Sequence, residues 1–150
     1  MNHKPLIEQT KVESDALEHV TRALEIMLGW TVASDGFARK LSSVRFFTEL
    51  YQRHIERLFA LEEIDGYMDA VSKLKPELAG RVATLKQEHE PLRAALRETV
   101  LRLDLALPTQ PEDFDRTCVQ LQNTINLVLK HLHRERELLV ESLDRDTGGE

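Results

Sequence analysis

Histidines are the residues of this sequence whose type and spacing suggest chemistry. The chain has 150 residues and six histidines. His19, His54, His89 and His131 come from four different segments of helical pattern, and each lies on or beside the apolar stripe of its segment. Imidazole nitrogens are common ligands of transition metals. The four histidines therefore predict one metal site inside a helical bundle.

A carboxylate accompanies the last of these histidines. Glu135 follows His131 by one helical turn, so both side chains project from the same face of a helix. A carboxylate beside several imidazoles suits iron, zinc or manganese better than calcium, which prefers oxygen ligands throughout. His133 and Glu137 repeat the spacing, but they belong to a charged run that is typical of a solvated face. We therefore add Glu135 to the predicted ligands and leave His133 out.

Four helices must bring these side chains to one height. Apolar residues recur at steps of three and four in four segments, near residues 15–32, 37–71, 76–103 and 109–143. In the first segment, His19 shares a face with a stripe of Ala16, Ala23, Ile26 and Trp30. At a rise of about 1.5 Å per residue, the four imidazoles lie roughly 14 to 24 Å above the end that holds the second loop. Such heights predict a single layer near the middle of the bundle.

The boundaries follow from helix-start and helix-stop signals. Asp15 and Glu18 form a capping-box pattern, and Pro76 is well placed as the first residue of the third helix. We predict an all-α, up-down-up-down four-helix bundle over residues 14–145. A flexible arm, residues 1–13, precedes it, and a tail, residues 146–150, follows it. Pro91 predicts either a kink in the third helix or the meeting of two shorter helices.

Composition narrows the classes of function. The formal net charge is −6 and the isoelectric point is near 5.6, which argues against a nucleic-acid surface. No segment approaches the ~20 apolar residues that span a bilayer, so we expect no membrane association. Cys118 is the only cysteine, which favours a reducing, cytoplasmic compartment. An unknown protein partner or a homo-oligomer is compatible with this composition.

The histidine motifs resemble those of the hemerythrin-like family, also called HHE domains. The matching residues are Glu18-His19, Arg53-His54, Glu88-His89 and His131-x-x-x-Glu135, over roughly residues 15–143. The resemblance implies a four-helix bundle that binds a non-heme di-iron centre and serves in binding or sensing of oxygen, redox state or iron. It implies that the metal ligands are His19, His54, His89, His131 and Glu135.

The chain departs from the family pattern on the second helix. Leu58 stands where the family has a carboxylate, and Arg53 and Arg57 replace a histidine and a glutamate. Glu62 comes two turns after His54, but its direction differs by about 80° on a helix of 3.6 residues per turn, so we expect it to substitute only with distortion. The resemblance thus implies a depleted ligand set, mononuclear or dinuclear, for non-heme iron or another transition metal.

Three functions follow from these patterns. The first is a metal-binding module that takes O₂, peroxide or a similar small molecule, and for it we expect binding or sensing rather than catalysis. The second is a metal-free structural or protein-interaction bundle whose core histidines are hydrogen-bonded. In that case neutral buried histidines would protonate below a pKa of about 6.5, and stability would fall in acid. The third is a non-heme iron oxidase or peroxidase.

Overall fold

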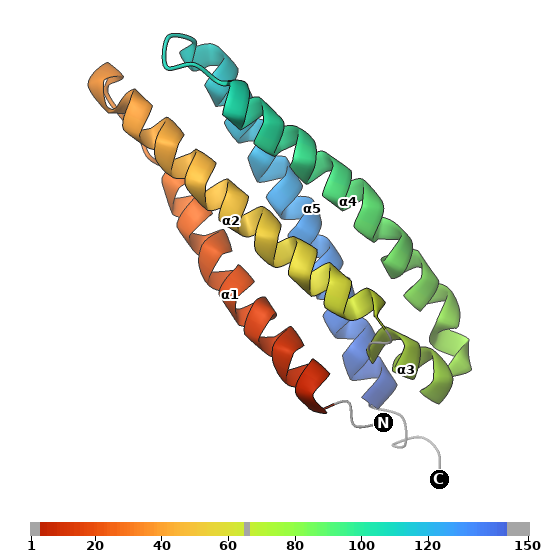
Figure 1. Ribbon diagram of the computed structural model, residues 1–150. Helices are drawn as coiled ribbons and strands as arrows, with labels where there is room; N and C mark the ends of the chain where they lie inside the picture. Colours follow the sequence, from red (N-terminus) through yellow and green to blue (C-terminus); the bar gives the residue numbers. More distant parts are fainter. Residues whose placement is uncertain (1–3, 65–66, 144–150) are drawn as a thin grey trace.

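The computed structural model describes residues 4–64 and 67–143, and within them it is an all-α bundle, as expected (Figure 1). The long helices are α1 (Lys4–Leu28), α2 (Phe37–Glu63), α4 (Ala79–Leu105) and α5 (Pro111–Leu143). The short helix α3 (Tyr67–Leu74) lies between α2 and α4 along the chain, and single 3₁₀ turns (Ser34–Gly36 and Pro76–Leu78) precede α2 and α4.

The connections gather at the two ends of the bundle. Figure 1 shows the α1–α2 and α4–α5 connections at one end, with α3, the start of α1 and the end of α5 at the other. The expected tail, residues 146–150, lies outside the described residues, as do residues 1–3 of the expected arm. The rest of the arm, residues 4–13, belongs to α1, so Asp15 lies within a helix and the predicted helix start there is wrong.

The buried face of α1 is not the face that the sequence analysis chose. Leu17, Val20, Leu24 and Met27 are buried, at steps of three and four, whereas Ile26 is 64% exposed. His19 lies on the exposed side with Glu18. The two stripes compete at helical spacing, and the face with the larger continuous aliphatic surface is buried because it removes more apolar area from water.

The second helix ends earlier than predicted. α2 stops at Glu63, where Ile64 leaves the helical conformation and its N–H bonds back to the Ala60 carbonyl. Residues 67–74 then form the separate helix α3. In contrast, α4 runs unbroken through Pro91, so the alternative of two shorter helices is wrong. These boundaries place Glu62 and Glu63 in the last turn of α2.

The apolar core consists of two clusters. The larger one joins α1, α2, α4 and α5 and includes Phe59, Leu92 and Val128. The smaller one joins α3, α4 and α5 and includes Leu85 and Leu138. Along α4 and α5, the residues between these clusters are polar and buried, namely His89, His131 and Glu135. A polar layer therefore separates two apolar regions, which is the position of the candidate site.

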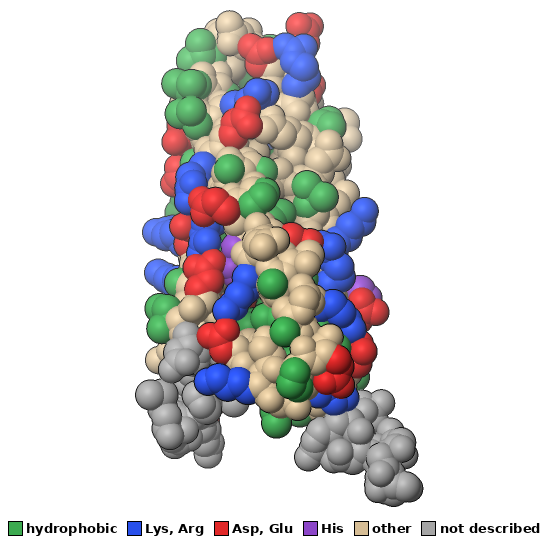
Figure 2. Space-filling view, turned by 90° about the vertical axis from the view of Figure 1, so that its right-hand side faces the viewer, with side chains coloured by type: hydrophobic (Ala, Val, Ile, Leu, Met, Phe, Trp, Pro, Cys, Tyr) green, Lys and Arg blue, Asp and Glu red, His purple; other side chains and the backbone are tan. Residues whose placement is uncertain are grey.

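The surface is charged and mixed in sign. On the described part of the face in Figure 2, Lys and Arg side chains alternate with Asp and Glu along the bundle, so this face presents no continuous basic surface. Among the described helices, none has the length and apolar character needed to cross a bilayer.

Candidate metal centre

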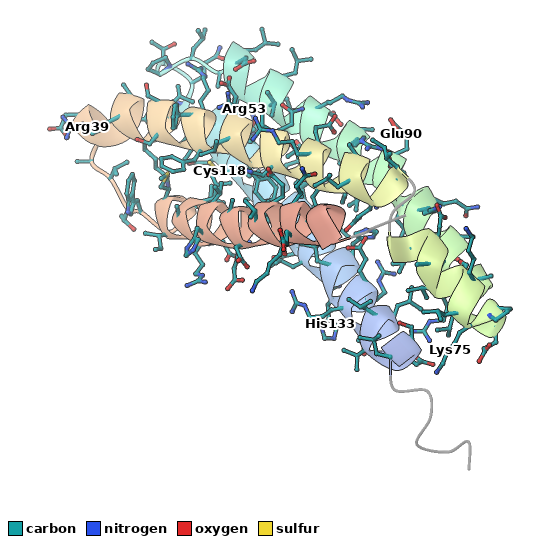
Figure 3. The ribbon with its side chains drawn as sticks, turned by 60° about the horizontal axis from the view of Figure 1, so that its bottom comes forward. Arg39, Arg53, Lys75, Glu90, Cys118 and His133 are labelled. Atoms are coloured by element: carbon teal, nitrogen blue, oxygen red, sulfur yellow. The ribbon has the colours of Figure 1, made fainter. Side chains whose placement is uncertain are left out.

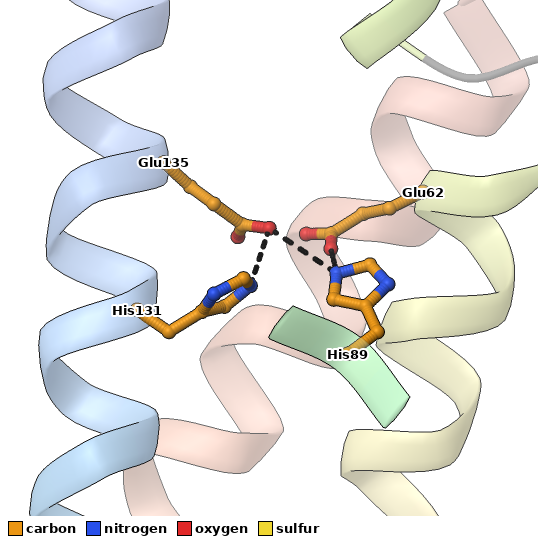
Figure 4. Close-up of side chains that lie close together, drawn as sticks. All are labelled: Glu62, His89, His131 and Glu135. Atoms are coloured by element: carbon orange, nitrogen blue, oxygen red, sulfur yellow. Dashed lines mark hydrogen bonds and ion pairs between the residues drawn. The ribbon is translucent and has the colours of Figure 1, made fainter. Parts of the chain in front are cut away.

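Four buried side chains from three helices converge in the polar layer. Glu62 comes from α2, His89 from α4, and His131 and Glu135 from α5 (Figure 4). One ligand atom from each lies within 4.8 Å of the others. All four residues are at most 4% exposed. This group could hold a metal ion, and we refer to these four residues as the inner group.

The distances inside the inner group are those of neighbouring ligands. His131 Nε2 lies 3.0 Å from Glu135 Oε2, and His89 Nε2 lies 3.1 Å from Glu62 Oε1 and 3.7 Å from Glu135 Oε2. Ligands about 2.1 Å from one ion are separated by ~3.0 Å in an octahedron and ~3.4 Å in a tetrahedron. The spacing therefore fits one ion between these atoms.

The outer nitrogen of each imidazole is held by a second carboxylate. His89 Nδ1 lies 2.6 Å from Glu63 Oε2, and His131 Nδ1 lies 2.7 Å from Glu88 Oε1. Because an ionised carboxylate only accepts hydrogen bonds, each Nδ1 must carry the proton and donate it. In a neutral imidazole, Nε2 then presents its lone pair to the inner group. Such carboxylate–histidine pairs are the usual outer support of metal-binding imidazoles.

Arginines fix these outer carboxylates. Arg93 donates to both oxygens of Glu63, at 2.8 and 2.9 Å, and Arg134 donates to Glu88 at 2.9 Å. The Arg93 hydrogen bonds lower the pKa of Glu63, so Glu63 stays ionised. The two chains of contacts, from arginine through glutamate to histidine, therefore orient both imidazoles before any ion is bound.

An aromatic ring completes the orientation of His89. Phe59 of α2 stacks on it with ring centroids 3.9 Å apart and an interplanar angle of 6°. Phe59 also meets His131 edge-on at 5.5 Å, and the Arg93 guanidinium lies 5.4 Å from the Phe59 centroid. The stacked ring prevents His89 from rotating away and excludes water from that side of the inner group.

The proton balance of the inner group follows from its burial. Burial raises the pKa of the Glu62 carboxyl to about 8, even though His89 opposes this shift. Burial also favours neutral His89, but hydrogen bonds with Glu135, Glu62 and Glu63 outweigh it and raise its pKa to about 9. For Glu135, burial is overcome by hydrogen bonds from His131, His89 and Glu62, which lower its pKa to about 2. Without an ion, the group therefore holds protons at neutral pH.

The structure brings together three of the five residues predicted as ligands, namely His89, His131 and Glu135. His19 is exposed on α1, so it does not reach the inner group, because the opposite face of α1 is buried. His54 is half-buried on α2, where its Nδ1 lies 2.7 Å from Glu13 Oε1 of α1. His54 therefore has a carboxylate partner but does not belong to the inner group.

Glu62 is the member that we expected to serve as a ligand only with distortion of the helix. The offset of about 80° compares the directions of Glu62 and His54 on the helix. Because His54 does not belong to the inner group, this offset does not decide whether Glu62 can be a ligand. A usable signal was present, because Glu62 follows Leu58 by four residues and Ile55 by seven, and both of these are buried. The supporting partner Glu63 had no such signal, because its contact with His89 crosses between helices. Glu88 appeared in the Glu88-His89 match, but its contact with His131 of another helix was not predicted.

Three further residues whose side chains could do chemistry lie outside the inner group. His133 is 67% exposed and projects outward from α5, as expected for a solvated face (Figure 3). Tyr51 is fully buried, with its pKa raised by burial and by nearby Glu25 of α1. Cys118 is half-buried, and burial raises its pKa to about 11, so it remains a thiol at neutral pH.

The inner group fits one divalent ion better than the di-iron centre that the family resemblance implies. Two neutral imidazoles and two carboxylates carry a charge of −2, which balances a single M²⁺. A second ion would need further bridging carboxylates, and no other group of metal-ligating residues converges within residues 4–64 and 67–143. The donor set lacks a thiolate and suits iron, manganese or zinc. Comparison of the chain with family models, with curated proteins and with solved structures found no match.

Proposed function

We propose that this protein is a metal-binding bundle that holds one divalent transition-metal ion through Glu62, His89, His131 and Glu135. The observation that carries the proposal is the direction of the two imidazoles. Each donates from Nδ1 to an outer carboxylate, so each Nε2 faces an inner carboxylate oxygen, at 3.0 Å for His131 and 3.1 Å for His89. Four acceptors facing one another in a buried layer require a cation or protons between them.

Non-heme iron(II) is the ion that we propose. Two histidines and one carboxylate form the ligand combination of non-heme iron sites with open positions, and here a second carboxylate is within reach. An iron site with an open position would bind O₂ or a related small molecule, which supports a role in sensing oxygen, redox state or iron. We further propose that the chain is a divergent up-down-up-down bundle of hemerythrin-like type, with a single-ion site.

A metal-free bundle is the second candidate. Both ring nitrogens of His89 and of His131 have a carboxylate oxygen within 3.1 Å, so protons alone can complete the hydrogen bonds of the inner group. This alternative predicts that the histidines support stability and bind no ion. An oxidase or peroxidase at the same ion would in addition turn over peroxide with a reductant, and that turnover would be lost in Glu135→Ala.

Metal analysis after reconstitution separates the candidates. The chelator-treated protein is incubated anaerobically with iron(II), desalted and analysed for metal, with cobalt(II) absorption as a second readout of coordination. We expect one ion per chain, and we expect that His89→Ala and His131→Ala each abolish binding. His54→Ala is the matched control, because His54 also pairs with a carboxylate but lies outside the inner group. If the wild-type protein retains no stoichiometric ion, the metal proposal fails and the metal-free bundle is supported.

A further inference from the structure

A pocket lies between α1 and α5 beside the inner group. Its volume is about 470 Å³, within the range of small-molecule sites. Its apolar wall consists of Leu58 of α2 and of Leu132, Leu139 and Leu143 of α5. Glu135 lines the same pocket, so the pocket reaches a member of the inner group. Such a wall favours a ligand with an aliphatic part.

Two cationic side chains line this pocket from opposite helices. Lys11 belongs to α1 and Arg136 to α5, and both are exposed. Within residues 4–64 and 67–143, neither takes part in an ion pair or a side-chain hydrogen bond. The lining also contains two acidic residues, the exposed Asp15 and the buried Glu135, and Glu135 is already paired with His131. Unpaired cations next to an apolar wall favour a ligand that has an anionic head and an apolar tail.

We propose that this pocket binds an aliphatic carboxylate of medium chain length, with the chain against the leucines and the head between Lys11 and Arg136. The buried Glu135 sets the orientation, because its carboxylate repels an anionic head placed at that part of the wall. A polyphosphate or another fully polar anion would leave the leucines without a partner. A neutral alkane would leave the two cations without one.

Calorimetric titration with three probes tests the class of ligand. The full chain, as purified and again after chelator treatment, is titrated with decanoate, decanol and butyrate. We expect saturable 1:1 binding of decanoate, several-fold weaker binding of decanol, and binding of butyrate that is more than about 100-fold weaker because it lacks six methylenes. The chelator-treated sample makes the result independent of whether the protein binds a metal. Equal affinity for decanoate and decanol, or no saturable binding of decanoate, overturns the proposal.

Variants locate the site. The double variant Lys11→Gln/Arg136→Gln should weaken decanoate binding about tenfold and change decanol binding less than about twofold, since two partly exposed charge-assisted contacts are removed. Ser14→Phe, which adds a ring to the α1 side of the pocket, should weaken both ligands. Arg53→Gln, on the exposed side of α2 (labelled in Figure 3), is the matched control and should change neither. Unaltered decanoate binding in both pocket variants, with their helical content and Tm intact, contradicts this placement.

Discussion

Each inner imidazole uses its two nitrogens in different ways. Nδ1 of His89 and of His131 donates outward to a carboxylate that an arginine holds, and Nε2 points inward. The outward hydrogen bond fixes both the tautomer and the ring angle, and its negative partner makes Nε2 a stronger base. The outer glutamates should therefore control how tightly an ion is held without touching it.

Neutralising these outer glutamates provides a direct measure of that control. We expect Glu63→Gln and Glu88→Gln each to weaken metal affinity by about 10- to 100-fold, because the amide still accepts the Nδ1 hydrogen bond but loses the charge. Competition against a chelator of known affinity gives the change. Glu13→Gln, which alters the matching partner of His54, should leave affinity unchanged. An equal loss in Glu13→Gln would show that the effect comes from general destabilisation.

The protons of the inner group set the pH dependence of the metal-free protein. His89 has its pKa raised from 6.5 to about 9, so its contribution to stability is complete below 6.5 and is lost as pH rises through 9. Glu62, raised from 4.5 to about 8, changes in the same direction. Glu135, lowered to about 2, stabilises above 4.5 and loses its contribution as pH falls toward 2. Above pH 6 the contributions of His89 and Glu62 are therefore lost as pH rises, which is opposite to the expectation for neutral buried histidines.

Denaturant titrations between pH 6 and pH 9 check this sign. The free energy of unfolding of the metal-free protein should fall by on the order of 5 kcal/mol over this interval, because His89 and Glu62 both contribute. Saturation with metal should flatten the dependence, because the ion replaces the protons. His133→Ala should keep the wild-type slope, since His133 is exposed. A metal-free protein that gains stability toward pH 9 would contradict the proton assignment.

At the scale of the helix, Pro91 can affect the site through the backbone of α4 rather than through side-chain contacts. It is exposed on α4, two residues after His89, and α4 remains a single helix through it. A proline there removes one backbone hydrogen bond and crowds the carbonyl one turn earlier. Its ring therefore affects the backbone segment that carries His89.

Replacing Pro91 with alanine tests whether this distortion matters. We expect Pro91→Ala to stabilise the protein by up to about 3 kcal/mol, because the backbone hydrogen bond is restored. The thermal midpoint and metal affinity are measured together, with the exposed substitution Glu90→Ala as the neighbouring control. A rise in Tm with unchanged affinity shows that the distortion is not needed to position His89. A fall in Tm would contradict the expected gain.

Helical periodicity predicted where the helices lie along the chain better than it predicted which face of each helix is buried. The buried residues of α4 keep the spacing of three and four from Val82 to Leu103, although the aliphatic Leu101 and Leu105 lie outside this stripe and are exposed. In the first segment, the stripe with Ile26 competes with the stripe of Leu17 and Leu24, and periodicity alone could not rank the two faces. The choice depends on which face its neighbours cover, which is a tertiary property.

The candidate site shows the same limit. His131 and Glu135 were found because their spacing on one helix is a local property. Glu62 was expected to fit only with distortion because its direction was compared with that of His54. The packing of α2 against α4 places the centre at the last turn of α2, beside Glu62. Contacts between helices, such as Glu63 with His89, have no periodic signal in a single sequence.

At the scale of the whole molecule, the polar layer between the two apolar clusters has a consequence for cooperativity. Leu92 and Leu85 of α4 belong to different clusters, and His89 lies between them. Apolar packing couples neighbouring regions of a core, and here the polar layer divides that packing into two separate clusters. In the metal-free protein, the end that contains α3 should therefore open separately from the rest.

Native-state amide hydrogen exchange can detect such separate opening. In the metal-free protein, amides of α3 and of the α4 segment near Val82 should exchange at a lower opening free energy than those near Leu96. An ion that joins α2, α4 and α5 should raise the protection of the α3 end toward that of the larger cluster. Bound metal would then link the α3 end to the rest of the bundle. Loss of the ion would allow the α3 end to unfold before the larger cluster.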